Sequence, residues 1–159
     1  SRGLGDVYKR QDLNLRSELW GLSESFKETV LEAVSYSSIV FGNLHEEFLL
    51  IYDGNEDTLD KHISEKQTFI CRDGHNGALG ITNKDKVISN AIPISPIDSV
   101  GAGDAFNTGF IYASCCGKDI EESLDIGNQV AAFKLLGSGA RHLPTKELLD
   151  DFNKKYQIN

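Results

Sequence analysis

Hydrophobic residues along the chain alternate between helical spacing and short continuous apolar runs. Phe26, Val30 and Leu31 recur at helical spacing and predict a helix that Ser23 or Ser25 caps and that runs to about residue 33. The same patterns predict further strands and helices: strands at 37–41, 68–71, 78–82 and 86–89, and helices at 46–51 and 59–65. This alternation predicts an α/β layer fold.

The last third of the chain is predicted to be mostly helical. After Pro93 and Pro96, a turn at 101–103 leads into a helix at 104–116, which Gly117 can end. Asp119 is placed to cap a helix that continues to about residue 136, and an amphipathic helix at 145–156 closes the chain.

Composition and charge narrow the class of protein. The 159 residues are 40% hydrophobic and 25% charged, which predicts one ordinary globular domain. The formal net charge is -8 and no segment concentrates Lys and Arg, so we expect no nucleic-acid partner. The apolar runs are too short to cross a bilayer, so we also expect a soluble protein without a membrane partner.

Cysteine and histidine usage excludes two common kinds of site. The three cysteines, Cys71, Cys115 and Cys116, are an odd number and do not predict a disulfide framework, which favours a reducing, cytoplasmic location. The four histidines are too scattered along the chain to predict a zinc site.

The first residues differ from the rest. The sequence has no methionine, and residues 1–11 show neither helical nor strand periodicity. We interpret 1–11 as a non-native leader and 12–159 as the native domain; a flexible native terminus is the alternative.

The most informative segment is the turn formed by Gly101, Ala102 and Gly103, followed by Asp104. A glycine-rich turn at the start of a helix presents unpaired backbone N–H groups at the positive end of the helix dipole, which attracts anions. A carboxylate placed there could accept a proton from a hydroxyl while the amides stabilise a transferring phosphoryl group. The alternative is that the glycines only make a tight turn and that Asp104 only favours the dipole.

The segment from Asp98 to Phe106, with Asn107 and Gly109 after it, resembles the C-terminal signature of the ribokinase-like (PfkB) carbohydrate kinases. The resemblance implies that Asp104 is the catalytic base and substrate contact, and that residues 101–103 form the anion hole for the γ-phosphate. It also implies that Asp98 helps to hold a monovalent cation, together with carbonyl groups near Gly139. Ser99 stands where the family usually has Thr and keeps the hydroxyl.

Three further matches follow the family's order. Asn43 to Glu46 resembles the N-x-x-E motif, which implies that Asn43 and Glu46 organise magnesium and phosphate, with Glu46 near Mg²⁺ through water. The segment 72–78 resembles the G-x-x-G stretch beside the nucleotide, with Gly74 and Gly77, and has Arg72 where relatives carry Thr or Lys. Asn128 matches a position against the adenine; an exposed polar helix residue is the alternative.

The resemblance extends back to residues 12–20, which are similar to the D-x-N-x-R...L-W stretch of fructokinases and 2-keto-3-deoxygluconate kinases. It implies that Arg16 lies near the sugar or its carboxylate, which a planar guanidinium can hold through two hydrogen bonds. An ordinary surface arginine is the alternative.

The match covers Asp12 to about Ile158, which corresponds to the C-terminal half of a family member. The resemblance therefore implies a three-layer ribokinase-like α/β fold with a mostly parallel sheet, lacking its first strands and the β-sheet lid. It implies phosphorylation of a sugar or sugar acid of the fructose or 2-keto-3-deoxygluconate type, with ATP, Mg²⁺ and K⁺. Because the missing half supplies most sugar contacts and the usual dimer contacts, we expect impaired activity here and a homodimer only in the full-length protein.

Three other classes of protein are alternatives to a carbohydrate kinase. A nucleotide-binding or regulatory module of the same fold without turnover stays open as the alternative. A P-loop ATPase lacks its G-x-x-x-x-G-K-[ST] motif, since Gly117 and Lys118 have neither the preceding glycine nor the following hydroxyl. A dinucleotide dehydrogenase would need a glycine at Phe106.

Overall fold

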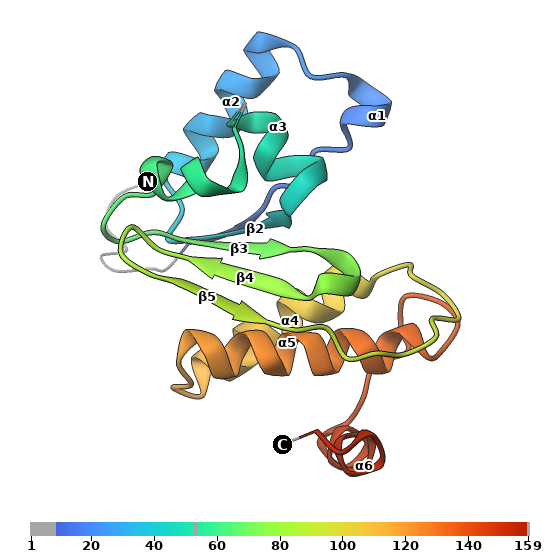
Figure 1. The fold of residues 1–159 in the computed structure, drawn as a ribbon. Helices are drawn as coiled ribbons and strands as arrows, with labels where there is room; N and C mark the ends of the chain where they lie inside the picture. Colours follow the sequence, from blue (N-terminus) through green and yellow to red (C-terminus); the bar gives the residue numbers. More distant parts are fainter. Residues whose placement is uncertain (1–8, 53, 159) are drawn as a thin grey trace. The chain divides into compact units, whose positions relative to one another are not determined.

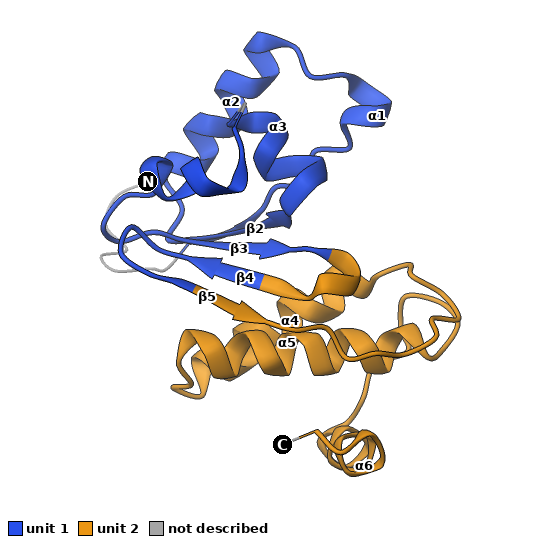
Figure 2. Cartoon of the chain, in the orientation of Figure 1, with its two compact units in different colours: residues 1–73, 79–86 blue, residues 74–78, 87–159 orange. Residues whose placement is uncertain are grey.

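The computed structural model describes residues 9–52 and 54–158. It has an α/β fold, as the pattern predicted, and divides into two compact units (Figure 2). The first unit comprises residues 1–73 and 79–86, and the second comprises 74–78 and 87–159.

The described strands form a mixed five-stranded sheet in the order β1-β2-β3-β4-β5 (Figure 1). Strands β1 (Arg10–Asp12), β2 (Ile39–Asn43) and β3 (Thr68–Arg72) are parallel. Asp12 pairs with Phe41, and Asn43 with Arg72, so the carboxyl ends of these strands lie at one edge. Strand β1 begins at Arg10, inside the segment interpreted as a leader, and residues 1–8 of that segment lie outside the described residues.

Strands β4 (Ala78–Ile81) and β5 (Lys86–Ser89) are the two strands predicted around the polar turn at 83–85. The turn is closed by the backbone N–H of Thr82, which donates to the carbonyl of Asp85 at 2.9 Å. The Thr82 hydroxyl also accepts the N–H of Asp85, so this side chain replaces a backbone acceptor inside the turn.

Helix α1 of the first unit was not predicted, and the other helices of this unit lie near their predicted positions but not always with the predicted type. Helix α1 is Ser17–Trp20, and α2 is Glu24–Ser35, whose N-cap Ser23 accepts the N–H of Phe26. The helix expected at 46–51 is a π-helix, η1 (Leu44–Phe48), followed by α3 (Leu49–Ile51), since the N–H of Leu49 donates five residues back to Leu44. The helix expected at 59–65 is the 3-10 helix η2 (Glu56–His62).

The core of the first unit lies where these helices meet its strands. Phe26, Val30 and Leu31 of α2, the residues whose spacing predicted that helix, pack against it. Among the strands, β2, β3 and β4 contribute buried members to this core, which comprises Leu13, Leu15, Val34, Val40, Leu44, Phe48, Ile51, Leu59, Ile63, Phe69, Cys71, Leu79 and Ile81. This burial fixes the strand ends from which the polar residues of the first unit project.

The second unit contains η3 (Gly74–Asn76), α4 (Ala102–Cys115), α5 (Ile120–Leu135) and α6 (Lys146–Tyr156). Helix α5 begins with a capping box between Asp119 and Glu122. Helices α4 and α5 pack closely at Gly109, where a Cβ would lie only 2.9 Å from the carbonyl oxygen of Ile126. In the part of the chain that is described, none of the helices combines the length and the apolar character that a membrane crossing requires.

Candidate functional site

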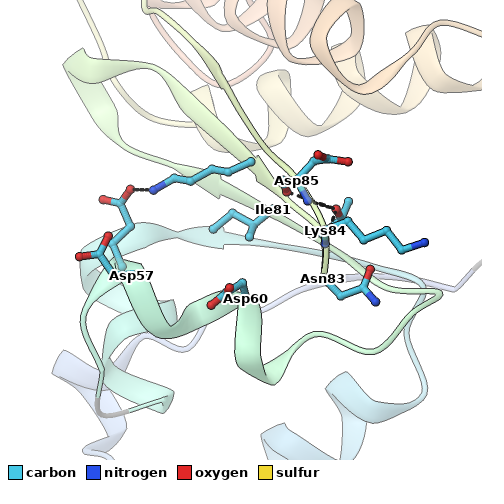
Figure 3. Close-up of a pocket in the computed structure, with 9 residues that line it drawn as sticks. Asp57, Asp60, Ile81, Asn83, Lys84 and Asp85 are labelled. Carbon is cyan, nitrogen blue, oxygen red and sulfur yellow. Dashed lines mark hydrogen bonds and ion pairs between the residues drawn. The ribbon is translucent and has the colours of Figure 1, made fainter.

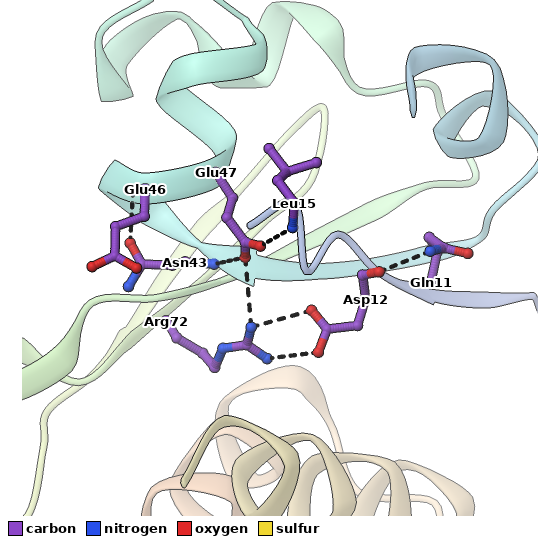
Figure 4. A network of polar contacts seen from close by, with 7 residues as sticks. All are labelled: Gln11, Asp12, Leu15, Asn43, Glu46, Glu47 and Arg72. Atoms are coloured by element: carbon purple, nitrogen blue, oxygen red, sulfur yellow. Dashed lines mark hydrogen bonds and ion pairs between the residues drawn. The ribbon is translucent and has the colours of Figure 1, made fainter. Parts of the chain in front are cut away.

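Asn43 ends strand β2 and begins η1, and its side chain and backbone are both engaged there (Figure 4). Its Oδ1 accepts the N–H of Glu46 at 2.9 Å, and its own N–H donates to Oε2 of Glu47 at 2.6 Å. The other oxygen of Glu47 accepts the N–H of Leu15 at 2.8 Å. Glu47, which directly follows the N-x-x-E segment, is therefore a buried carboxylate that joins the end of β2 to the segment after β1.

Arg72 lies at the end of β3 and pairs with two acidic groups, Asp12 at the end of β1 and Glu47 in η1 after β2 (Figure 4). Its two terminal nitrogens donate to the carboxylate of Asp12 at 3.2 and 3.4 Å, and one lies 3.7 Å from Glu47 Oε2. This arrangement gives Arg72, which the resemblance left without a clear role, a structural function at the carboxyl edge of the sheet.

Glu46 and Arg16, two other predicted residues of the first unit, are both exposed. Arg16 adopts a left-handed backbone conformation, with φ 48°, and its carbonyl begins α1 by accepting the N–H of Leu19 at 2.8 Å. In the described part of the chain, no three His, Cys, Asp or Glu side chains are grouped closely enough to hold a metal ion. An Mg²⁺ ion at Glu46 would therefore need phosphate and water oxygens to complete its coordination.

Helix α4 begins within the glycine-rich turn of the second unit, at Ala102, two residues earlier than the sequence predicted. Gly101 is the N-cap, with φ 81°, and a Cβ there would lie 2.9 Å from the Cβ of Ala140. The N–H of Ala102 donates to the carbonyl of Ser99 at 3.1 Å, so this amide closes the turn. The next amides, of Gly103 and Asp104, belong to the first helical turn, where no intrahelical acceptor exists.

Asp104 is the third residue of α4 and is exposed. Its carbonyl accepts the hydroxyl of Thr108 at 2.8 Å, while its carboxylate has no hydrogen-bond partner among the residues that the structure describes. A carboxylate in the first turn is stabilised in its charged form by the helix dipole. Asp104 is thus accessible and adjacent to the open amides, as a base beside an anion site must be.

Asp98 is held by backbone donors on both sides of its carboxylate. The N–H of Val100 donates to Oδ1 at 2.9 Å and the N–H of Gly139 to Oδ2 at 2.7 Å. These two hydrogen bonds, with a smaller contribution from the nearby charge of Lys134, lower the pKa of Asp98 below its ordinary value. The carbonyl of Asp98 accepts the ammonium group of Lys134 at 2.6 Å.

The two glycines of the G-x-x-G segment do different things. Gly74 has φ 55° and open space where a side chain would be. Gly77 has φ 102°, and a Cβ there would lie 2.1 Å from the carbonyl oxygen of Ser89. Gly77 is therefore required by a close approach of two backbone segments, whereas Gly74 is required only by its dihedral angles.

Asn128 is buried in α5, with 8% of its surface exposed, which contradicts the alternative of an exposed polar residue. Its side-chain amide donates to the hydroxyl of Ser89 at 2.8 Å, to the Ser89 carbonyl at 3.2 Å and to that of Asn90 at 3.3 Å. It therefore fastens the end of β5 to α5.

A pocket of about 200 Å³ lies elsewhere in the first unit (Figure 3). Its lining is mainly charged, and one of its lysines, Lys86, pairs with Glu56. The remaining lining residues are Asp57, Asp60, Ile81, Thr82, Asn83, Lys84 and Asp85. It contains none of the predicted site residues.

The predicted residues are thus divided between the units. The first contains Arg16, Asn43, Glu46 and Arg72, and the second contains Gly74, Gly77, Asp98, residues 101–104 and Asn128. Sequence reasoning missed two residues, Glu47 and Lys134. Glu47 is adjacent to a recognised motif, but an acidic residue in that position gives no signal of burial, and a lysine in a helix is normally exposed.

Comparisons with known proteins agree with these motifs. Residues 6–147 match the model of the pfkB family carbohydrate kinases. The ribokinase of Bacillus subtilis is 28% identical over 123 residues, which are 76% of this chain and 41% of that protein. The nucleoside kinase of Methanocaldococcus jannaschii is 28% identical over 143 residues, 86% of this chain and 46% of that protein.

A solved structure shows the same fold. A double mutant of the fructokinase from Vibrio cholerae O395, in its fructose-, ADP- and potassium-bound form, superposes with a TM-score of 0.81 and 27% identity. The match covers 91% of this chain and 50% of that one. This chain spans about half the length of the relatives it matches. Since the family model covers most of its residues and the motifs occur in order, the chain belongs to the pfkB family of carbohydrate kinases.

Proposed function

We propose that the protein transfers the γ-phosphate of ATP to a hydroxyl group of a sugar or sugar acid. The observation that carries the proposal is the position of Asp104: an exposed carboxylate in the first turn of α4, beside amides without intrahelical acceptors. Family membership supports a kinase, and the relatives act on different substrates by their names: ribose, nucleosides and fructose.

In this proposal Asp104 accepts the proton of the attacking hydroxyl. The amides of the 101–103 turn stabilise the negative charge that develops on the phosphoryl group. Because the N–H of Ala102 is bonded to Ser99, the amide of Gly103 and that of Asp104 itself are the better placed donors. Preorganised amides of this kind stabilise charge without reorganising during the reaction.

We propose that Asn43 and Glu46 help to position the nucleotide phosphates and Mg²⁺. The other proposed nucleotide-binding residues are Gly74, Gly77, Arg72 and Asn128. Mg²⁺, when bound, neutralises charge on the phosphates. Glu46 fits such a role because its carboxylate is exposed, whereas the neighbouring Glu47 is buried and accepts two backbone N–H groups. Arg72 and Asn128 would act through the segments they hold.

Arg16 is proposed to contact the substrate, which favours fructose or 2-keto-3-deoxygluconate. Its side chain is exposed, and its guanidinium has no hydrogen-bond or ion-pair partner in the described part of the chain. A free guanidinium can bind a carboxylate through two hydrogen bonds, so a sugar acid would gain more than a neutral sugar. Comparing kcat/KM for the two sugars in wild type and Arg16→Gln tests this assignment.

The decisive experiment replaces Asp104 by Asn in the full-length protein. General base catalysis contributes about 10²–10⁴-fold, so we expect kcat to fall by at least about 100-fold. Asp151→Asn on α6 is the matched control, because its exposed carboxylate pairs with Lys154 at the surface, and it should retain full activity. A kcat within about tenfold of wild type, equal to some 1.4 kcal/mol, would exclude Asp104 as the base.

The alternative of a nucleotide-binding module without turnover is favoured by one observation, the coverage of only 41% of the ribokinase relative. Calorimetry with ATP beside a coupled phosphorylation assay on the 159-residue chain distinguishes the two. Binding with no phosphate transfer at any sugar would support the module for this chain. Transfer in the longer protein alone would support the kinase.

We also propose a cytoplasmic location, which the free cysteines Cys71, Cys115 and Cys116 support. A homodimer is proposed only for the full-length protein, and sedimentation of that protein tests it.

A further inference from the structure

Lys134 is the most unusual charged residue of the second unit, because its side chain is fully buried, with 0% exposure. Lysine is almost never fully buried unless its ammonium group is paired. Here the ammonium donates to the backbone carbonyl of Asp98 at 2.6 Å. A formal positive charge therefore lies inside the protein, directly against the loop that carries the kinase signature.

The loop around Asp98 is closed onto the end of α5 by several hydrogen bonds. The N–H of Ile97 donates to the carbonyl of Leu135 at 2.7 Å, next to Lys134 in sequence. In the opposite direction, the N–H of Gly139 donates to Asp98 Oδ2 at 2.7 Å. The loop preceding α4 and the loop following α5 are thus connected through Asp98 and Lys134.

The donor set at Asp98 does not fit the monovalent cation that the family resemblance implies there. A K⁺ ion needs oxygen atoms that face it, usually carbonyls that replace its water shell. In this structure the carbonyl oxygen of Asp98 faces an ammonium group, and each carboxylate oxygen faces a backbone N–H. A second cation at the Asp98 carbonyl oxygen would meet the Lys134 charge at close range.

We infer that the ammonium group of Lys134 takes the place of a bound monovalent cation at the Asp98 loop. It supplies the positive charge that holds the 98–101 turn against the end of α5, without an ion from solution. This inference refines the cofactor part of the proposed function: a kinase of this sequence would need ATP and Mg²⁺ but no K⁺. The N-terminal turn of α4, with Asp104, would then be ordered at any K⁺ concentration.

The test is thermal unfolding of the chain without nucleotide or sugar, in about 100 mM KCl against the same concentration of choline chloride, since a ligand that binds only the folded state raises the Tm. We expect no K⁺-specific change in the Tm of the wild type. A saturable K⁺-specific rise of about 2–4 °C would overturn the inference, because it would show that the ion binds while Lys134 is present. The measurement needs no catalysis, so it can fail independently of the kinase assay.

Lys134→Met removes the charge and ends one atom short of the lysine nitrogen, which leaves room for an ion at the Asp98 carbonyl. We expect its Tm to be lower than that of the wild type in choline chloride and to rise in KCl. Lys118→Met is the matched control, because Lys118 is exposed and pairs with Glu122 at the surface, and it should show no K⁺ response. A folded Lys134→Met that ignores K⁺ would contradict the inference. If Lys134→Met does not fold, titration of the wild type with Tl⁺, a probe for K⁺ sites, decides: saturable binding overturns the inference, and its absence supports it.

Discussion

Glu47 accepts the backbone N–H of Asn43 at 2.6 Å, four residues earlier in the chain, and so fixes the start of the N-x-x-E segment. Its other oxygen accepts the N–H of Leu15, 32 residues away. One buried carboxylate therefore satisfies two backbone donors from different strand ends. The neighbouring Glu46 leaves its own carboxylate exposed.

Replacing Glu47 by Gln should destabilise the protein by about 1–3 kcal/mol, since an amide nitrogen would then face a backbone N–H and leave a buried donor unsatisfied. Urea unfolding of both variants measures the effect. Glu46→Gln is the control, and as an exposed substitution it should change the free energy of unfolding by no more than about 0.5 kcal/mol. A larger loss in Glu46→Gln than in Glu47→Gln would contradict this assignment.

Arg72 and Asp12 should be coupled, because the guanidinium makes two contacts with that carboxylate across the ends of β3 and β1. Both side chains are partly exposed, at 17% and 30%, so solvent screening limits the interaction to about 1 kcal/mol. A double-mutant cycle with Arg72→Met and Asp12→Asn measures the coupling free energy, which should decrease at high salt. A coupling free energy near zero at low salt would show that the two side chains lie close together without stabilising the fold.

The two glycines of the G-x-x-G segment should respond differently to alanine. Gly74→Ala should lower the free energy of unfolding by about 1–2 kcal/mol, because alanine must adopt a left-handed backbone conformation there, although its Cβ would meet open space. Gly77→Ala should cost clearly more, because its Cβ would also collide with the carbonyl of Ser89 and force the backbone to move. Chemical denaturation of the two variants compares them directly, and equal losses would disprove the close approach at Gly77.

Asp98 should make stability depend on pH in the acid range. Its pKa is lowered in the folded state, so the unfolded chain binds its proton at a higher pH than the folded chain does. The stabilisation is therefore present above the ordinary carboxyl pKa and is lost as the pH falls through the lower, folded value. Asp98→Asn should flatten this part of the stability curve between neutral and strongly acid pH, as measured by Tm. An unchanged pH dependence would show that the Val100 and Gly139 hydrogen bonds do not favour the carboxylate.

The sequence alone determined the features that depend on neighbours along the chain. Ser23 and Asp119 cap their helices as predicted because a cap bonds to an N–H two or three residues away. Strands β2 to β5 and a helix beginning at the glycine-rich turn were predicted for the same reason, and the order of the motifs indicated the family; strand β1, within a segment without periodicity, was not predicted.

Only the tertiary structure decided the roles of Glu47, Arg72, Asn128 and Lys134. Each of these side chains bonds to a partner 32 to 60 residues away in the chain, such as Leu15, Asp12, Ser89 or Asp98. A charged side chain looks the same in a sequence whether it is solvated or buried. A buried polar side chain differs from a solvated one in having a hydrogen-bond partner that folding brings close. Because this partner is distant in the chain, the local spacing of residues does not predict it.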